Sequence, residues 1–208
     1  MLDMKADYAI LMDGGFVRVK VGQKCGRFPM VEDILYEVKK IKAHKLLVGK
    51  SLLRVYYYDA PPASGMMKNP IDGTVLDLTK HPTYARNQSL QQGLEMQADF
   101  ALRVGELSVS GWTLGRTALH RIKQNGPRVL TARDMVPKIE QKGVDLRIGL
   151  DIARLSLRGI VSAIVVVTGD SDIIPAFKFA RREGVRVYLD HMGHGVKRDL
   201  KAHTDAIL

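Results

Sequence analysis

Short apolar runs alternate along the chain with segments in which apolar residues recur every three or four positions. The runs are typical of strands buried on both faces of a sheet, and the recurring pattern is typical of amphipathic helices. We expect strands at residues 8–12, 52–58, 163–167 and 185–189. We expect helices at residues 31–45, 145–158 and 173–183, and weaker ones at 82–97 and 195–202.

Two further stretches carry turn residues. Residues 60–80 contain Pro, Gly, Ser and Asn, which predicts a loop. The apolar residues at 100–104 and 112–114 flank Ser108-Val109-Ser110-Gly111, which predicts a hairpin. Strands that alternate with helices predict an α/β fold, in which a mainly parallel sheet is covered by helices on both faces. A length of 208 residues suits a single domain.

Composition narrows the setting. The only cysteine, Cys25, excludes an internal disulfide framework and a cysteine zinc cluster, so we expect a reduced, cytoplasmic protein. No run of about 18 apolar residues exists that could cross a membrane. Residues 1–5 contain an early acid and lead straight into an apolar run, which is not the pattern of a secretion signal.

The charge of the chain points to a partner. Its 32 basic and 22 acidic residues give a net charge of +10. The positive electrostatic field of such a protein attracts polyanions, which predicts a polyanionic partner. The simpler alternative is a basic surface that binds no particular partner. The most basic long segment is 112–142, with seven Lys or Arg residues and two acids. Because the positive charges are spread along the chain, any binding surface must be folded.

Aspartates follow all four predicted strands within three residues: Asp13, Asp59, Asp170 and Asp190. Ligands of open parallel sheets bind outside the carboxyl ends of the strands, so these acids are expected at a site. Asp is also common in turns and helix caps, which is the favoured interpretation for Asp59 and Asp190 taken alone. Asp172 could likewise cap the next helix. However, Asp170 and Asp172 also repel each other, and a bound cation would remove that penalty.

The predicted helix at 145–158 carries two acids in different positions. At about 100° per residue, Asp145 lies within a wide apolar arc. That arc contains Leu146, Ile148, Leu150, Ile152, Ala153 and Leu155. Asp145 is therefore either an N-cap or a site acid that faces the strand ends. Asp151 lies on the polar face among Arg147, Arg154 and Arg158. It is most simply a solvated partner of these arginines, and otherwise an accessory site residue.

Asp13, Asp145, Asp170 and Asp172 form a donor set of oxygens alone, which suits Mg²⁺ or Mn²⁺ and not zinc. Such sites polarise a phosphoryl oxygen and activate water for in-line attack. Thr168 and Ser171 are expected to orient ligands. Lys142 is either a phosphate contact or an ordinary surface lysine. The histidines are scattered, and none is an obvious general base.

Three pieces of the sequence resemble the NYN domain family, a branch of the PIN-like nucleases. They are Ala9-Ile10-Leu11-Met12-Asp13-Gly14-Gly15-Phe16, then Gln141-Lys142-Gly143-Val144-Asp145, then residues 165–175 around Thr168-Gly169-Asp170-Ser171-Asp172. The resemblance implies a Rossmann-like α/β/α sandwich, metal-dependent RNA cleavage, and metal ligation by Asp13, Asp145, Asp170 and Asp172. Many members carry Asn shortly after the first Asp, where this chain has Phe16. Residues 60–130 match no piece of the pattern and are expected to be an insertion that contains the hairpin.

Our leading hypothesis is therefore a single NYN/PIN-like domain over residues 1–208 that hydrolyses RNA with Mg²⁺ or Mn²⁺. The expected nucleic-acid contacts are Arg116, Arg121, Lys123 and Lys142. The chain is also a possible homodimer. The alternative is a non-catalytic RNA-binding or adaptor module that kept the fold, which Phe16 motivates. A phosphatase of the haloacid dehalogenase type needs a second Asp two residues after Asp13, but that position is Gly15.

Overall fold

A six-stranded sheet forms the centre of the protein in the computed structural model, which describes residues 6–208. Every pair of neighbouring strands in it is parallel. The strand order is β10 (Ala206–Ile207), β9 (Arg186–Asp190), β8 (Ala163–Val167), β1 (Tyr8–Asp13), β2 (Leu52–Asp59) and β5 (Phe100–Val104). The predicted parallel sheet and its four predicted strands are confirmed. The interpretation of residues 1–5 as lacking a secretion signal lies outside the described residues.

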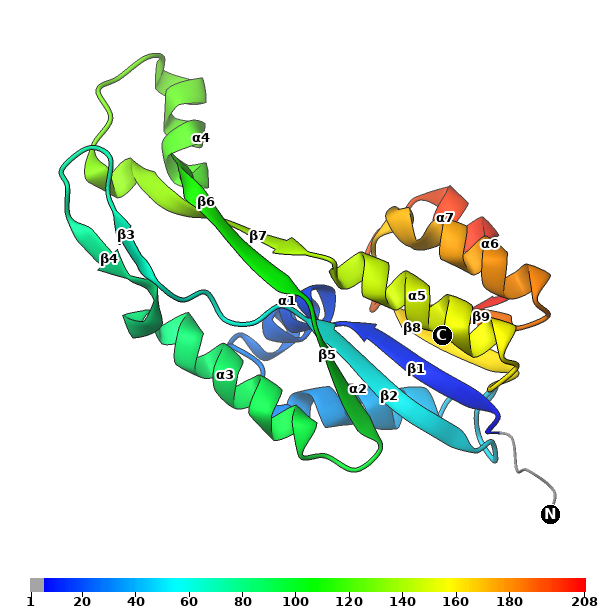
Figure 1. Cartoon of the computed structure of the whole chain (residues 1–208). Helices are drawn as coiled ribbons and strands as arrows, with labels where there is room; N and C mark the ends of the chain where they lie inside the picture. The colour runs from blue at the N-terminus through cyan, green and yellow to red at the C-terminus, as the bar shows by residue number, and fades with distance from the viewer. Residues whose placement is uncertain (1–5) are drawn as a thin grey trace.

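Helices cover both faces of this sheet (Figure 1). One face packs against α5 (Val144–Leu157) and α6 (Ile174–Arg182), with the short α7 (Arg198–Ala202) beside them. The other face packs against α1 (Gly14–Cys25), α2 (Val31–Lys42) and α3 (Pro82–Glu95). The result is the expected three-layer α/β/α arrangement. No helix among residues 6–208 is long and apolar enough to span a membrane.

The central strand β1 shows why the two cores form. Its side chains alternate between the faces, so that Ala9 and Leu11 join the α5–α6 core while Ile10 and Met12 join the α1–α2 core. All four are completely buried. Burial of each large side chain contributes roughly 1.5–3 kcal/mol, which favours a strand covered on both sides.

Two excursions leave the sheet on its carboxyl side. The first contains the hairpin of β3 (Met66–Lys68) and β4 (Val75–Asp77), the 3-10 turn η1 (Leu78–Lys80), and α3. The second, which we call the arm, spans residues 106–142 and projects from the body (Figure 1). It consists of β6 (Glu106–Leu114), α4 (Arg116–Asn125), the 3-10 turn η2 (Ala132–Asp134) and β7 (Met135–Lys142).

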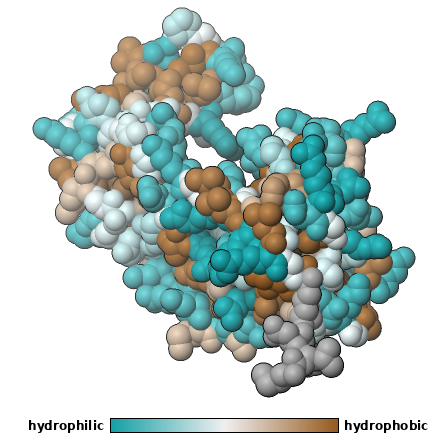
Figure 2. Space-filling model, turned by 45° about the vertical axis from the view of Figure 1, so that its right-hand side comes forward, coloured by the Kyte–Doolittle hydropathy of each residue, from teal (hydrophilic) through white to brown (hydrophobic). Residues whose placement is uncertain are grey.

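Glycines at the base of the arm allow the chain to leave and return. A Cβ atom on Gly105 would lie 2.9 Å from the Lys142 carbonyl oxygen. The segments that enter and leave the arm can therefore lie this close only because residue 105 has no side chain. Gly143 has φ 71°, a left-handed conformation that glycine adopts without strain. Figure 2 shows one lobe of the molecule set apart from the rest by a notch.

The structure corrects three local predictions. Residues 60–80 are not only loop, because they include the β3–β4 hairpin. The hairpin predicted at 100–114 is wrong, since β5 pairs with β2 and β6 pairs with β7. The turn-like residues around Gly111 instead lie at an irregularity within β6. Because β5 belongs to the main sheet, the range 60–130 contains a core strand and is not one continuous excursion.

The helical wheel of α5 also differs from the prediction. Its buried stripe consists of Val144, Ile148, Ile152, Leu155 and Ser156. Leu146 and Leu150, which we expected in the apolar arc, are 64% and 60% exposed. Asp145 is exposed as well and does not face the core. The helix contacts the sheet along a narrower stripe than its apolar residues predict.

Candidate acidic site at the strand ends

Asp13 is the best-anchored acid of the predicted site. It ends β1 and caps α1, where its Oδ1 accepts a hydrogen bond from the Phe16 backbone N–H at 3.1 Å. Its Oδ2 accepts from the Thr168 hydroxyl at 3.3 Å. A Cβ atom on Gly14 would lie 2.5 Å from the Tyr58 carbonyl oxygen, so the helix can begin directly after Asp13 only with glycine at that position.

The loop after β8 brings two more acids to the same edge. Thr168 is buried, and its hydroxyl oxygen accepts the Asp170 backbone N–H at 3.1 Å while the hydroxyl donates to Asp13. The Asp170 carboxylate in turn accepts the Asp172 backbone N–H at 2.9 Å. Both carboxylates are exposed at the surface. Ser171 lies between them and is half-buried.

Asp145 completes the set from the first turn of α5, where the N-cap residue is Gly143. The pKa of the Asp13 carboxyl is raised to about 6: burial is the largest cause, the charges of Asp145 and Asp170 add to it, and two hydrogen bonds oppose it. Burial, followed by the charges of Asp170 and Asp172, also raises the pKa of Asp145. The four predicted acids are thus close enough to destabilise one another's ionised forms.

The donor chemistry of this set fits a hard divalent cation, because all its ligands would be oxygens. A cation would also offset the mutual repulsion of the carboxylates. No group of three or more Asp, Glu, His or Cys side chains within residues 6–208 is gathered around one point to hold a metal ion. Binding would therefore require side chains to turn inward, and the exposed Asp145, Asp170 and Asp172 have room for this.

Asp151 belongs to a different network. Its Oδ2 accepts hydrogen bonds from the Tyr58 hydroxyl at 2.8 Å and from Arg103 Nε at 3.2 Å. The expected partners on its own helix do not pair with it; Arg147, for example, donates to the Val104 carbonyl oxygen. Burial and the neighbouring Asp151 charge raise the pKa of Tyr58, which therefore stays protonated. Asp151 ties α5 to β2 and β5.

Asp59, the acid at the end of β2, is completely buried, which the turn interpretation did not predict. It forms an ion pair with Arg18 of α1 and accepts a hydrogen bond from Gln141 Nε2 at 3.2 Å. Its own loop contributes the Ala60 backbone N–H at 2.9 Å. The sequence signal for Asp59 was its place after a strand, but nothing in the sequence links it to Arg18 or Gln141.

Phe16 stands where the resemblance to the NYN family led us to expect a polar residue. Its ring packs on Gly169, where a Cβ atom would come within 2.6 Å of the ring. The His194 ring lies 5.8 Å from that of Phe16, and Lys20 Nζ lies 5.9 Å from its centroid. Phe16 thus supports the Thr168–Asp172 loop, while its backbone N–H still binds Asp13.

The predicted nucleic-acid contacts lie on the arm. Arg116, Arg121 and Lys123 are exposed on α4, at the end of the arm far from the sheet (Figure 1). Lys142 is exposed at the base of the arm, three residues before Asp145. Two other cations of the arm have acidic partners, since Arg128 pairs with Asp134 and Lys138 with Glu140, while Arg133 is exposed. Of the four predicted contacts, Lys142 is thus the one at the base of the arm, and the three on α4 are far from the sheet.

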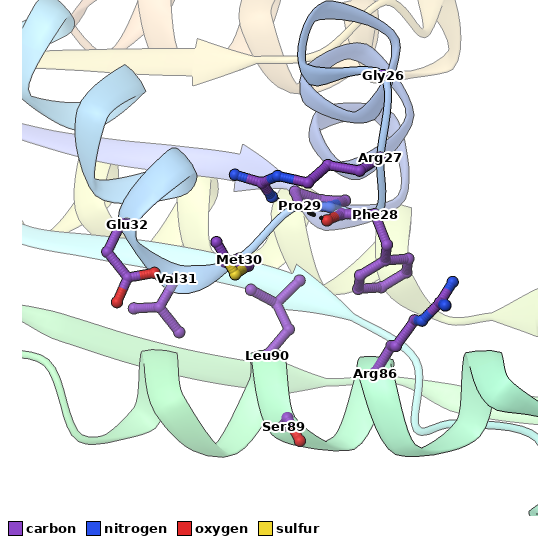
Figure 3. A pocket seen from close by; sticks show the side chains of 10 residues that line it. All are labelled: Gly26, Arg27, Phe28, Pro29, Met30, Val31, Glu32, Arg86, Ser89 and Leu90. Carbon is purple, nitrogen blue, oxygen red and sulfur yellow. Dashed lines mark hydrogen bonds between the residues drawn. The ribbon is translucent and has the colours of Figure 1, made fainter.

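A cavity of about 630 Å³ lies between the α1–α2 turn and α3, at the end of α1 opposite Asp13. Figure 3 shows Phe28 and Leu90 lining it, with Arg86 at its edge. Arg27 also lines it but pairs with Asp33 at 2.7 Å. None of the predicted site acids lines this cavity, so it is separate from the acidic site.

Comparison with known proteins supports the family resemblance. Residues 116–207 match the family model of the NYN domain, which belongs to the PIN-like nuclease superfamily. The matched segment runs from α4 to β10 and includes Asp145, Asp170 and Asp172, whereas Asp13 lies before it. No curated protein and no solved structure matched the chain.

Proposed function

We propose that this chain, whose residues 116–207 match the NYN domain family, is a metal-dependent ribonuclease that hydrolyses phosphodiester bonds of RNA. In this proposal Asp13, Asp145, Asp170 and Asp172 hold Mg²⁺ or Mn²⁺. The observation that carries it is geometric: Asp13, held by the Phe16 N–H and the Thr168 hydroxyl, lies at the same sheet edge as the Asp170 loop, close enough for the charges of Asp145 and Asp170 to act on it. Carboxylates that repel one another at the carboxyl ends of parallel strands are typical of a site for a hard divalent cation.

The proposed role of each site residue follows from its position. A bound divalent cation supplies Lewis acidity toward a phosphoryl oxygen and lowers the pKa of water. Asp13 is the fixed ligand, because the Phe16 N–H and the Thr168 hydroxyl hold its two oxygens. The exposed Asp145, Asp170 and Asp172 adapt to the cation. Lys142, exposed at the base of the arm three residues before Asp145, would neutralise a phosphate beside the acids.

The second candidate function is RNA binding without cleavage. The Phe16 ring on Gly169 favours it, because an apolar group stands where many relatives present a polar side chain. Both functions use the basic arm and both suit a cytoplasmic protein with its lone exposed thiol at Cys25 reduced. They differ only in whether the acids bind a cation and promote hydrolysis.

End-labelled RNA incubated with Mg²⁺, Mn²⁺ or excess EDTA tests the proposal. We expect cleavage with either metal, none with EDTA, and none with Asp170→Asn. Asp151→Asn is the matched control, because it removes a carboxylate of α5 that the structure places outside the acidic set. RNA that is bound but never cut would favour the non-catalytic module. DNA of the same sequence, assayed in parallel, tests the choice of RNA.

A further inference from the structure

A second cavity, of about 440 Å³, opens between the first excursion and the base of the arm. Its size lies within the ~300–1,000 Å³ range of small-molecule sites. Apolar side chains from both excursions form most of its wall, among them Pro61, Leu78, Leu107 and Ile139. Tyr84 of α3 adds an aromatic ring. The lining is that of a site for a flat, largely apolar group.

This cavity shares a wall with the acidic edge of the sheet. Arg18 and Gln141 line it, and both also hold the Asp59 carboxylate. Asp59 ends β2 next to the end of β1, where Asp13 lies opposite Tyr58 in the register. An RNA strand whose phosphate reaches the acids would therefore have a neighbouring base beside the cavity.

Asn87 gives the cavity a polar group that has no partner. Its amide oxygen is buried and accepts no hydrogen bond from any residue in the described range 6–208. Buried polar atoms are normally paired, and a rotation of the Asn87 side chain toward the cavity would let a ligand there supply the missing partner. A half-turn about the last side-chain bond exchanges the oxygen and the nitrogen, so the amide offers a ligand both an acceptor and donors.

We infer that this cavity binds one unpaired adenine base of the RNA, stacked on Tyr84 and hydrogen-bonded by Asn87. The inference rests on the proposed ribonuclease function and adds a base preference to it. Single-stranded RNA is recognised by splayed bases that stack on aromatic side chains and are read along their edges.

The choice of adenine follows from the polar groups of the wall. An Asn amide matches the N6 and N7 atoms of adenine with two hydrogen bonds. Guanine is usually bound by a free Arg or Lys, but Arg18 is engaged by Asp59. Cytosine is usually bound by a carboxylate, and no Asp or Glu of the described chain lines the cavity.

Titration of the metal-free protein with AMP, GMP, CMP and UMP, followed by NMR, tests the inference without any cleavage. The phosphate is common to all four, so differences report the base. We expect AMP to bind at least about fivefold more tightly than GMP, CMP or UMP, the lower end for one well-formed base contact. Asn87→Leu should abolish this preference. Tyr84→Leu should weaken the binding of all four nucleotides by about fivefold or more, because each base loses its stacking partner.

Gln88→Leu is the matched control, because Gln88 is the exposed neighbour on α3 and does not line the cavity. Equal binding of the four nucleotides, or an AMP preference that survives Asn87→Leu, would overturn the inference. Cleavage of RNA by a protein with no such preference would leave the ribonuclease proposal standing alone. An AMP preference that depends on Asn87 without any cleavage would support the pocket and reject the ribonuclease.

Discussion

Replacement of Asp13 by Asn should stabilise the metal-free protein. The amide is neutral and keeps an oxygen that can accept the Phe16 N–H, while its nitrogen can donate to the Thr168 hydroxyl. The pKa of Asp13 rises from 3.8 to about 6 in the fold, a difference of about 2.2 units. At about 1.36 kcal/mol per unit, ionised Asp13 lowers the free energy of unfolding by up to about 3 kcal/mol.

The stability gained by Asp13→Asn should depend on pH. Because the folded pKa is raised, the penalty is absent below the unfolded value of 3.8 and fully present above about pH 6. The advantage of Asp13→Asn should therefore be near zero at pH 3.5 and reach its maximum by pH 7. Urea denaturation in EDTA at several pH values measures it.

Asp33→Asn provides a control of opposite sign. Arg27 and the Met30 N–H lower the pKa of Asp33, so its charge stabilises the fold above the unfolded pKa, and that contribution is lost on acidification. We expect this variant to be less stable than the wild type at pH 7. An Asp13→Asn variant that is equally stable or less stable than the wild type at pH 7 in EDTA would refute the electrostatic account of the site.

Three further predictions concern other parts of the molecule. Asp145→Asn should abolish metal-dependent cleavage, whereas Asp151→Asn should retain it. Asp151→Asn should lose about 1 kcal/mol of stability, because it weakens the hydrogen bonds from Tyr58 and Arg103. Equal loss of activity by both variants in RNA cleavage assays would place Asp151 in the site. Joint replacement of Arg116, Arg121 and Lys123 by Ala should weaken RNA binding uniformly across sequences. The slope of log K against log salt concentration should also shrink by up to about two units, at about 0.7 per lost phosphate contact. Unchanged affinity and slope in titrations at several salt concentrations would exclude α4 from binding. Gly169→Ala should cost about 1–3 kcal/mol in thermal denaturation, because its Cβ atom would meet Phe16 at 2.6 Å and His194 at 2.9 Å; adding Phe16→Ala should restore part of the loss, and no restoration would show that the ring is not the obstacle.

The sheet could be predicted from the sequence because its central strands need no distant information. Residues 163–167 form a continuous apolar run, and such a run is stable only where both faces are covered. The rule that parallel strands present their carboxyl ends together then placed Asp13 and Asp170 at one edge. These inferences depend on local pattern and on a general property of parallel sheets.

Other features depend on contacts between distant residues. The Gly14-Gly15 pair looks like a turn, yet it begins α1, because the close approach of β2 leaves no room for a side chain on Gly14. Strand β5 pairs with β2 across more than forty residues, so its local turn signals misled the hairpin prediction. The burial of Asp59 likewise depends on Arg18, which lies on another element.

The projecting arm sets a length scale for any strand that binds both of its ends. The nine residues of β6 span about 30 Å at roughly 3.4 Å per residue. A stacked nucleic-acid strand covers that distance with about nine nucleotides at ~3.4 Å each. If RNA binds as proposed, a fully stacked oligonucleotide shorter than this would reach the acids or α4 but not both, and an unstacked strand would need fewer nucleotides. On the proposed function, affinity should therefore rise in a step once the strand is long enough to contact both the acids and α4.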